Sequence, residues 1–154
     1  MLHIVLYEPE IPPNTGNIIR LCANTGARLH LIQPMGFSLT DKQCRRAGLD
    51  YEEYANIQVY DNLADCYARN PDLRFFGCTT KAEQQHDQPR YTQQDAFLFG
   101  PESRGLPTHV LNALPDTQKI RIPMQPTSRS LNLSNACSII LYEAWRQLNF
   151  IPMA

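Results

Sequence analysis

The sequence predicts an α/β protein with a mainly parallel sheet and helices on both faces of that sheet. Short apolar runs alternate along the chain with segments of helical periodicity that begin and end on recognisable signals. The length of 154 residues, with 43% hydrophobic and 19% charged residues, suits a single soluble domain spanning residues 1–154. A chain of this size can bury a core without disulfides or a structural metal.

Six short apolar runs are typical of buried strands. They are Leu2–Tyr7, Arg28–Ile32, Ile57–Tyr60, Leu73–Thr79, Ala96–Gly100 and Lys119–Pro123. Strands of a parallel sheet are covered on both faces, so they are apolar along most of their length. Because helical segments separate most of these runs, crossover connections and parallel pairing are expected.

Helical patterns lie between most of the predicted strands. The expected helices are Gly16–Thr25, Asp41–Gly48, Asn62–Arg69, Pro107–Leu114 and Leu133–Asn149. Gly26 is placed to end the first, Asp41 to cap the second and Pro107 to open the fourth. The segment Lys81–Gln94 is polar and weakly patterned, and we expect it to be a mobile surface loop.

The last predicted helix is apolar on nearly every side. Its clearly polar residues between Ala136 and Leu148 are only Ser138, Glu143, Arg146 and Gln147. A helix that is apolar all round must be covered all round. We therefore expect the polar Ile122–Ser134 loop, which leads into this helix, to be held in a buried place.

Composition argues against several classes of protein. No apolar run approaches the roughly 20 residues needed to cross a membrane. The five cysteines form no CxxC pair and the four histidines show no ligand spacing, which predicts reduced thiols in a cytosolic protein without a metal site. The net charge of −1 does not indicate nucleic-acid binding by the whole surface; a local basic face and a mixed surface both stay open.

Three polar loops follow predicted strands, and ligands of open parallel sheets bind beyond the carboxyl ends of the strands. The loops are Glu8–Asn17, Phe99–Pro107 and Ile122–Ser134. The first leads into a helix amino end, which favours an anion, although an ordinary cap with a solvated Arg20 fits the same residues. In the second, Gly100 allows a close approach to the backbone, and a plain Gly-Pro turn is the alternative.

The residues of these loops indicate a polar ligand site without naming its ligand. Ser130, Asn132 and Ser134 offer hydroxyls and amides in the third loop. The chain has neither a GxGxxG nor a GxxxxGK[ST] motif, which argues against the usual dinucleotide site and against a P-loop.

The same loops resemble, in order, the three motifs of the SPOUT class of RNA methyltransferases, and within it the SpoU-type ribose 2′-O-methyltransferases. The matching segments are Asn14-Thr-Gly-Asn-Ile-Ile-Arg20, Phe99-Gly-Pro-Glu-Ser-Arg-Gly-Leu-Pro107, and Ile122-Pro-Met with Ser130-Leu-Asn-Leu-Ser-Asn-Ala136. The two ends of the chain are similar to small bacterial members that methylate the wobble ribose of leucine tRNAs. The resemblance covers almost the whole chain and departs from it at Lys81–Gln94 and at the short tail, Ile151–Ala154.

The resemblance implies a deep C-terminal trefoil knot, a homodimer and S-adenosyl-L-methionine as methyl donor. It further implies that the substrate is the wobble nucleotide, C or a modified U, in the anticodon stem-loop of leucine tRNAs. Methylation of another tRNA position or of ribosomal RNA is the alternative, as is a knotted RNA-binding protein without catalysis.

The resemblance also implies a set of site residues. The cofactor positions are Cys78, Gly100, Ile122, Ser130 and Leu131, and the catalytic positions are Arg20, Asn14, Glu102, Ser130 and Asn132. The family position of Arg20 is often described as a general base. A guanidinium stays protonated at ordinary pH, so a grip on an RNA phosphate and an electrostatic effect on the hydroxyl is the safer interpretation.

Overall fold

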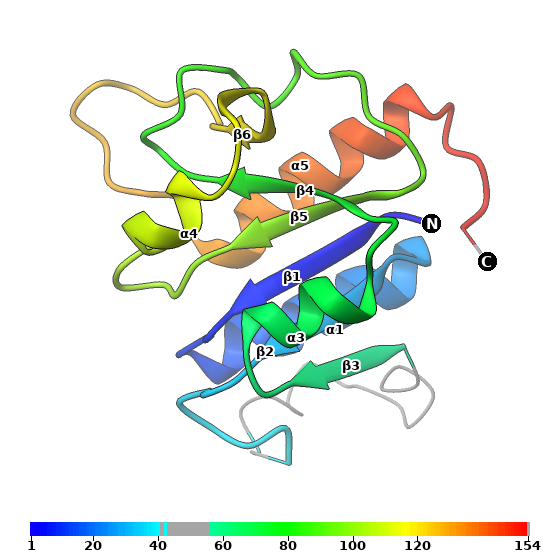
Figure 1. The fold of residues 1–154 in the computed structure, drawn as a ribbon, viewed down its shortest axis with the longest axis vertical. Coiled ribbons are helices and arrows are strands. Elements are labelled where there is room, and N and C mark those ends of the chain that lie inside the picture. Colours follow the sequence, from blue (N-terminus) through cyan, green and yellow to red (C-terminus); the bar gives the residue numbers. More distant parts are fainter. Residues whose placement is uncertain (41, 43–55, 154) are drawn as a thin grey trace.

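The computed structural model describes residues 1–40, 42 and 56–153. Six strands form one sheet in the order β3-β2-β1-β5-β4-β6 (Figure 1). They are β1 His3–Tyr7, β2 Arg28–Ile32, β3 Ile57–Tyr60, β4 Arg74–Cys78, β5 Asp95–Phe99 and β6 Lys119–Ile120. Every pairing between them is parallel, which confirms the predicted sheet.

The strand bounds agree with the sequence to within a residue or so, except at β6. We expected this strand to continue to Pro123, but it ends at Ile120. Beyond it, Arg121 forms a single bridge with Gln85, which lies outside the named strands. Pro123 has no N–H to donate to a ladder, so the segment after Arg121 leaves the sheet.

The described helices are α1 Pro12–Thr25, α3 Leu63–Arg69, α4 Thr108–Asn112 and α5 Leu133–Gln147, with a 3-10 turn, η2, at Asp116–Gln118. The predicted helix Asp41–Gly48 lies outside the described residues. Helix α1 begins at Pro12, four residues earlier than predicted, because proline is tolerated in a first turn. Gly26 ends α1 in the left-handed conformation with φ 86°, as predicted.

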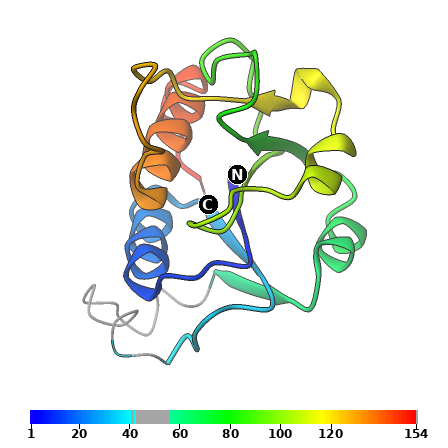
Figure 2. The same cartoon turned by 90° about the vertical axis from the view of Figure 1, so that its left-hand side faces the viewer.

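The helices form a layer on each face of the sheet. Helices α1 and α5 lie side by side on one face, and α3 and α4 cover the other (Figure 2). The first layer buries Ile18 and Ile140 against Leu29, and the second buries Leu63 and Val110 against the opposite face. This arrangement confirms the prediction of helices on both faces.

Helix α5 is only half covered within one chain. Cys137, Ile140, Leu141 and Ala144 are buried, but Ile139 and Tyr142 are 38% and 43% exposed. The loop before the helix is also exposed from residue 125 to residue 132, so the prediction of a buried loop is wrong. Its backbone can be solvated by water, and only the inner side of α5 meets the core.

The segment 81–94 is fastened to the fold, which makes the expectation of a mobile loop wrong. Tyr91 is 5% exposed and packs edge-on against Phe76 and Phe97. The side chain of Gln147 on α5 accepts from the Tyr91 N–H at 3.0 Å and donates to the Pro89 carbonyl at 3.1 Å. Sequence patterns missed the anchors on Gln147 because they join residues more than 50 positions apart in the chain.

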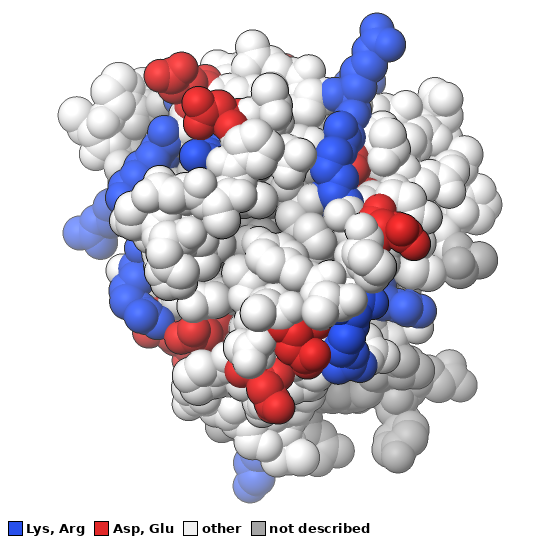
Figure 3. All heavy atoms as spheres, in the orientation of Figure 1, with Lys and Arg blue, Asp and Glu red and all other residues white. Residues whose placement is uncertain are grey.

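Within the described residues, no helix is long and apolar enough to cross a membrane. Positive and negative side chains alternate on the face seen in Figure 3, without a broad area of one sign. That pattern agrees with a mixed surface there. The knot that the resemblance implies stays a prediction.

Candidate functional site

A groove of about 480 Å³ lies beyond the carboxyl ends of the central strands. It is lined by parts of all three polar loops, together with Ala136 and Ile140 on the inner side of α5. We call it the motif groove. The five predicted cofactor positions line it together: Cys78, Gly100, Ile122, Ser130 and Leu131.

Sheet topology explains why these distant residues meet. Cys78 ends β4 and lies opposite Phe99 on one neighbouring strand and Ile120 on the other. The residues that follow these three strands therefore leave the sheet at one edge. Burial raises the pKa of the Cys78 thiol well above its usual range, so this sulfur is a neutral wall atom and not a nucleophile.

Glu102 caps the amino end of α1 from another loop. Its carboxylate accepts from the backbone N–H groups of Glu10 at 2.9 Å and Ile11 at 2.8 Å. Ile11 is the N-cap residue of α1 and has no side-chain cap of its own. The anion that the sequence predicted at this helix end is thus the protein's own carboxylate, where the helix dipole favours it.

Asn14 connects all three loops. Its amide nitrogen donates to Glu102 at 3.2 Å, and its amide oxygen accepts from the Asn132 side chain at 3.0 Å. Asn132 in turn is the N-cap of α5, where its side-chain oxygen accepts from the Ser134 N–H at 2.9 Å. Three predicted catalytic residues therefore form one hydrogen-bonded chain that closes one side of the motif groove.

Gly100 is needed for a close approach within the chain itself. A Cβ atom at this position would lie 2.2 Å from the Gly105 carbonyl carbon and 2.2 Å from the Leu106 nitrogen. The sequence predicted such an approach, but the neighbour is the turn of the same loop. Two further contacts hold this loop against the first one. The Glu10 carboxylate accepts a hydrogen bond from the Ser103 hydroxyl at 2.7 Å, and the Glu8 carboxylate forms an ion pair with the Arg104 guanidinium at 3.7 Å.

Arg20 is the one predicted catalytic residue that the structure does not bring to the groove. It lies on α1 six residues beyond Asn14, which is about 9 Å along the helix axis. It is half-buried and is not among the residues that line the motif groove. Within one chain, Arg20 therefore lies outside the motif groove.

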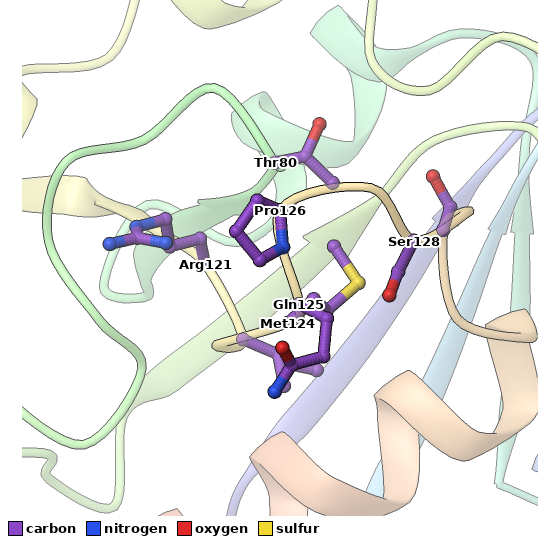
Figure 4. Close-up of a pocket in the computed structure, with 8 residues that line it drawn as sticks. Thr80, Arg121, Met124, Gln125, Pro126 and Ser128 are labelled. Atoms are coloured by element: carbon purple, nitrogen blue, oxygen red, sulfur yellow. The ribbon is translucent and has the colours of Figure 1, made fainter.

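A smaller polar pocket of about 250 Å³ adjoins the motif groove (Figure 4). We call it the side pocket; its polar lining residues are Thr80, Arg121, Gln125, Ser128 and Ser130. Lys81 and Arg121 also line the motif groove itself. Sequence reasoning missed Thr80, Lys81 and Arg121, although their positions just past β4 and β6 were a usable signal.

Sequence comparison places the chain among known proteins. The sequence model of the SpoU rRNA Methylase family matches residues 1–142. The tRNA (cytidine(34)-2′-O)-methyltransferase of Escherichia coli K12 is 61% identical over 151 residues, which cover 97% of this chain and 96% of that protein.

Structural comparison agrees. A solved structure described as giving insight into 2′-OH methylation of C/U34 on tRNA superposes with a TM-score of 0.90 at 44% identity, covering 97% of both chains. The SpoU methyltransferase AviRb of Streptomyces viridochromogenes, solved with the cofactor AdoMet, shares the fold with a TM-score of 0.83 at 24% identity. That alignment covers 97% of this chain and 58% of AviRb.

Proposed function

The chain belongs to the SpoU rRNA methylase family, and from this premise we propose that it methylates the ribose 2′-hydroxyl of nucleotide 34, the wobble position, of leucine tRNAs. The observation that carries the proposal is the motif groove. Three loops that match the family's motifs close around it, and they are joined by the chain Glu102, Asn14 and Asn132.

The family uses S-adenosylmethionine, and the residues present fit that cofactor. The groove volume of about 480 Å³ lies in the range of roughly 300–1,000 Å³ typical of small-molecule sites. Its walls combine apolar groups, such as Ile122 and Leu131, with polar side chains, such as Ser130 and Asn132. The bound cofactor supplies an electrophilic methyl group on a good leaving group, so the protein has chiefly to align and activate the hydroxyl.

The choice of substrate follows from the relatives. The curated relatives at 57% and 61% identity carry the name tRNA (cytidine(34)-2′-O)-methyltransferase and match this chain along nearly its whole length. Position 34 lies in the anticodon stem-loop, which is the RNA element that we propose for the site, and we propose leucine tRNAs as its source.

Arg20 supplies the positive charge in this proposal. Its guanidinium holds a phosphate next to the target ribose and stabilises negative charge on the reacting oxygen. The proton leaves to the phosphate or to water, because arginine has no lone pair to accept it.

A homodimer brings Arg20 and the groove into one site. Arg20 lies on α1, and the exposed Ile139 and Tyr142 lie on α5, which packs beside α1 in the same layer (Figure 2). A second copy that covers these apolar residues would also meet Arg20. We therefore propose that Arg20 acts on the groove of the other protomer.

The test is methyl transfer from labelled S-adenosylmethionine to leucine tRNA transcripts, followed by nucleoside mass spectrometry. We expect one 2′-O-methylated nucleotide, at position 34. A transcript with a 2′-deoxy residue at that position is the control and should accept no label. Label in ribosomal RNA but not in tRNA would contradict the proposal.

A further inference from the structure

We propose that the side pocket binds a backbone phosphate and ribose of the substrate RNA, with Arg121 as its principal cation. This inference rests on the proposed function, since it assigns a subsite for the same RNA. Of the polar residues that line the side pocket, only Ser130 belongs to the predicted catalytic set.

The lining of the side pocket is chemically suited to an anion. Thr80, Ser128 and Ser130 offer hydroxyls, Gln125 offers an amide and Arg121 offers a guanidinium. None of the described residues that line it is acidic. Such donors make most protein contacts to phosphate and sugar in nucleic-acid complexes.

The size and position of the side pocket limit the kinds of ligand that it can bind. A volume of about 250 Å³ is below the roughly 300–1,000 Å³ of sites that enclose a whole small molecule, so the pocket suits one part of a longer chain. It shares Thr80, Arg121, Ile122, Met124 and Ser130 with the motif groove. A ribose placed for methylation in the groove would have its neighbouring phosphate within reach of this pocket.

The frame of the pocket is already ordered. The Ser128 N–H donates to the Gln125 carbonyl at 3.0 Å and closes a turn with Pro126 at its second position. Arg121 is held on both sides of its backbone: its N–H donates to the Gln84 carbonyl at 2.9 Å, and its carbonyl accepts from the His86 N–H at 2.8 Å. The anchored 81–94 segment therefore fixes the backbone position of Arg121.

The side chain of Arg121 is available for a ligand. Across the described part of the chain, its guanidinium makes no hydrogen bond or ion pair. Figure 4 shows the guanidinium directed away from the other labelled lining residues, so the proposal requires the Arg121 side chain to turn toward the pocket when a phosphate is bound. Among the described residues that line the motif groove, Glu102 is the one acid; it already accepts from two backbone N–H groups and does not compete for Arg121.

The experiment compares Arg121→Ala with Arg90→Ala. Arg90 is an exposed arginine of the same fastened segment that lines neither pocket. Affinity for leucine tRNA is measured over a range of salt concentrations, and affinity for S-adenosylhomocysteine by calorimetry. Loss of one phosphate contact should weaken RNA binding about tenfold and reduce the slope of log affinity against log salt by about 0.7. Arg90→Ala should match the wild type.

Arg121→Lys is the second variant. It keeps the charge and should keep the salt slope while losing the two-oxygen grip. Circular dichroism checks that each variant is folded.

The outcomes separate the alternatives. If Arg121→Ala loses affinity for S-adenosylhomocysteine but not for 5′-methylthioadenosine, Arg121 holds the cofactor's carboxylate and the inference is wrong. If the wild type methylates tRNA and Arg121→Ala binds RNA with unchanged affinity and slope, the inference fails while the proposed function stands. A wild type that neither binds nor methylates tRNA defeats the proposed function as well.

Discussion

The Glu102 carboxylate lies 2.8 Å from the backbone nitrogen of Ile11, a residue 91 positions away, and so caps a helix that has no cap of its own. This contact makes the second loop part of the amino end of α1. The same carboxylate holds Asn14, which holds Asn132 at the start of α5. One acidic side chain therefore links the amino ends of the two helices that flank the site.

Glu102→Gln should lower both stability and cofactor affinity. An amide presents an NH₂ group to donors that need an acceptor, and an unsatisfied group of this kind costs about 1–3 kcal/mol. Urea unfolding should show a lower midpoint than Glu83→Gln, a matched change at an exposed acid. Equal midpoints for the two variants would mean that the cap contributes nothing to stability.

Arg20→Ala should keep the fold and the cofactor affinity but lose methyl transfer, because Arg20 does not line the groove. Removing one well-placed electrostatic group costs on the order of 10²–10³ in rate. Arg20→Lys should be nearly as poor at pH 7 and should regain part of its rate as the pH rises and the hydroxyl ionises more readily. A Lys variant whose rate stays flat with pH would speak for an arginine base.

The exposed side of α5 should carry the dimer contact. Tyr142→Glu places a charge on an apolar residue that is 43% exposed, and we expect a monomer by light scattering at micromolar concentration. Val59→Glu, on an apolar residue that is 39% exposed on β3, should stay dimeric. A stable dimer of the Tyr142 variant would show that the interface lies elsewhere on the protein. A monomeric wild type would contradict the proposed dimer itself.

Mixing two inactive variants should restore activity if Arg20 acts on the other protomer's groove. Arg20→Ala keeps an intact groove, and Ala136→Trp fills a groove-lining position on α5. In a mixed dimer, the Arg20→Ala protomer supplies an intact groove and the Ala136→Trp protomer supplies the Arg20 that acts on it. Each mixed dimer therefore has one complete site, and we expect up to about half the wild-type rate. Calorimetry is the control, and it should show that Ala136→Trp no longer binds S-adenosylhomocysteine. No recovery after verified subunit exchange would place Arg20 on its own groove.

Two buried histidines should make the protein sensitive to acid. His3 Nδ1 lies 2.9 Å from His30 Nε2, and His30 Nδ1 lies 2.8 Å from the Tyr60 hydroxyl. Burial lowers the pKa of His3 to about 4 and that of His30 to about 3; the N-terminal amine adds to the effect at His3, the neighbouring His3 adds to it at His30, and Arg28 contributes at both.

Because these pKa values are depressed on folding, the unfolded chain takes up protons first as the pH falls below about 6.5. Stability is therefore full above that pH and is lost toward pH 4. We expect the free energy of unfolding to drop by roughly 2–4 kcal/mol between pH 7 and pH 5. The double variant His3→Gln with His30→Gln should lose most of this drop, and the exposed His109→Asn should keep it. The same pH slope in both variants would assign it to other groups.

The three polar loops that the sequence predicted do meet at one groove. Parallel strands place the residues that follow them at a common edge, which is why loops far apart in the chain lie together. The individual positions Cys78, Gly100, Ile122, Ser130 and Leu131 came from the family resemblance; the structure brings them together, and their role in cofactor binding stays a prediction. Strand bounds were close because a buried strand is marked by its own apolar run.

Only the tertiary structure decided which side chains hold one another. The amino-acid sequence determined the α/β class, the parallel sheet and the three loops, because those follow from local patterns. It did not determine that Glu102 caps α1, that segment 81–94 is fastened by Tyr91 and Gln147, or that one side of α5 stays exposed. Such contacts join residues far apart in the chain, and their energies depend on burial and geometry that exist only after the sheet has formed.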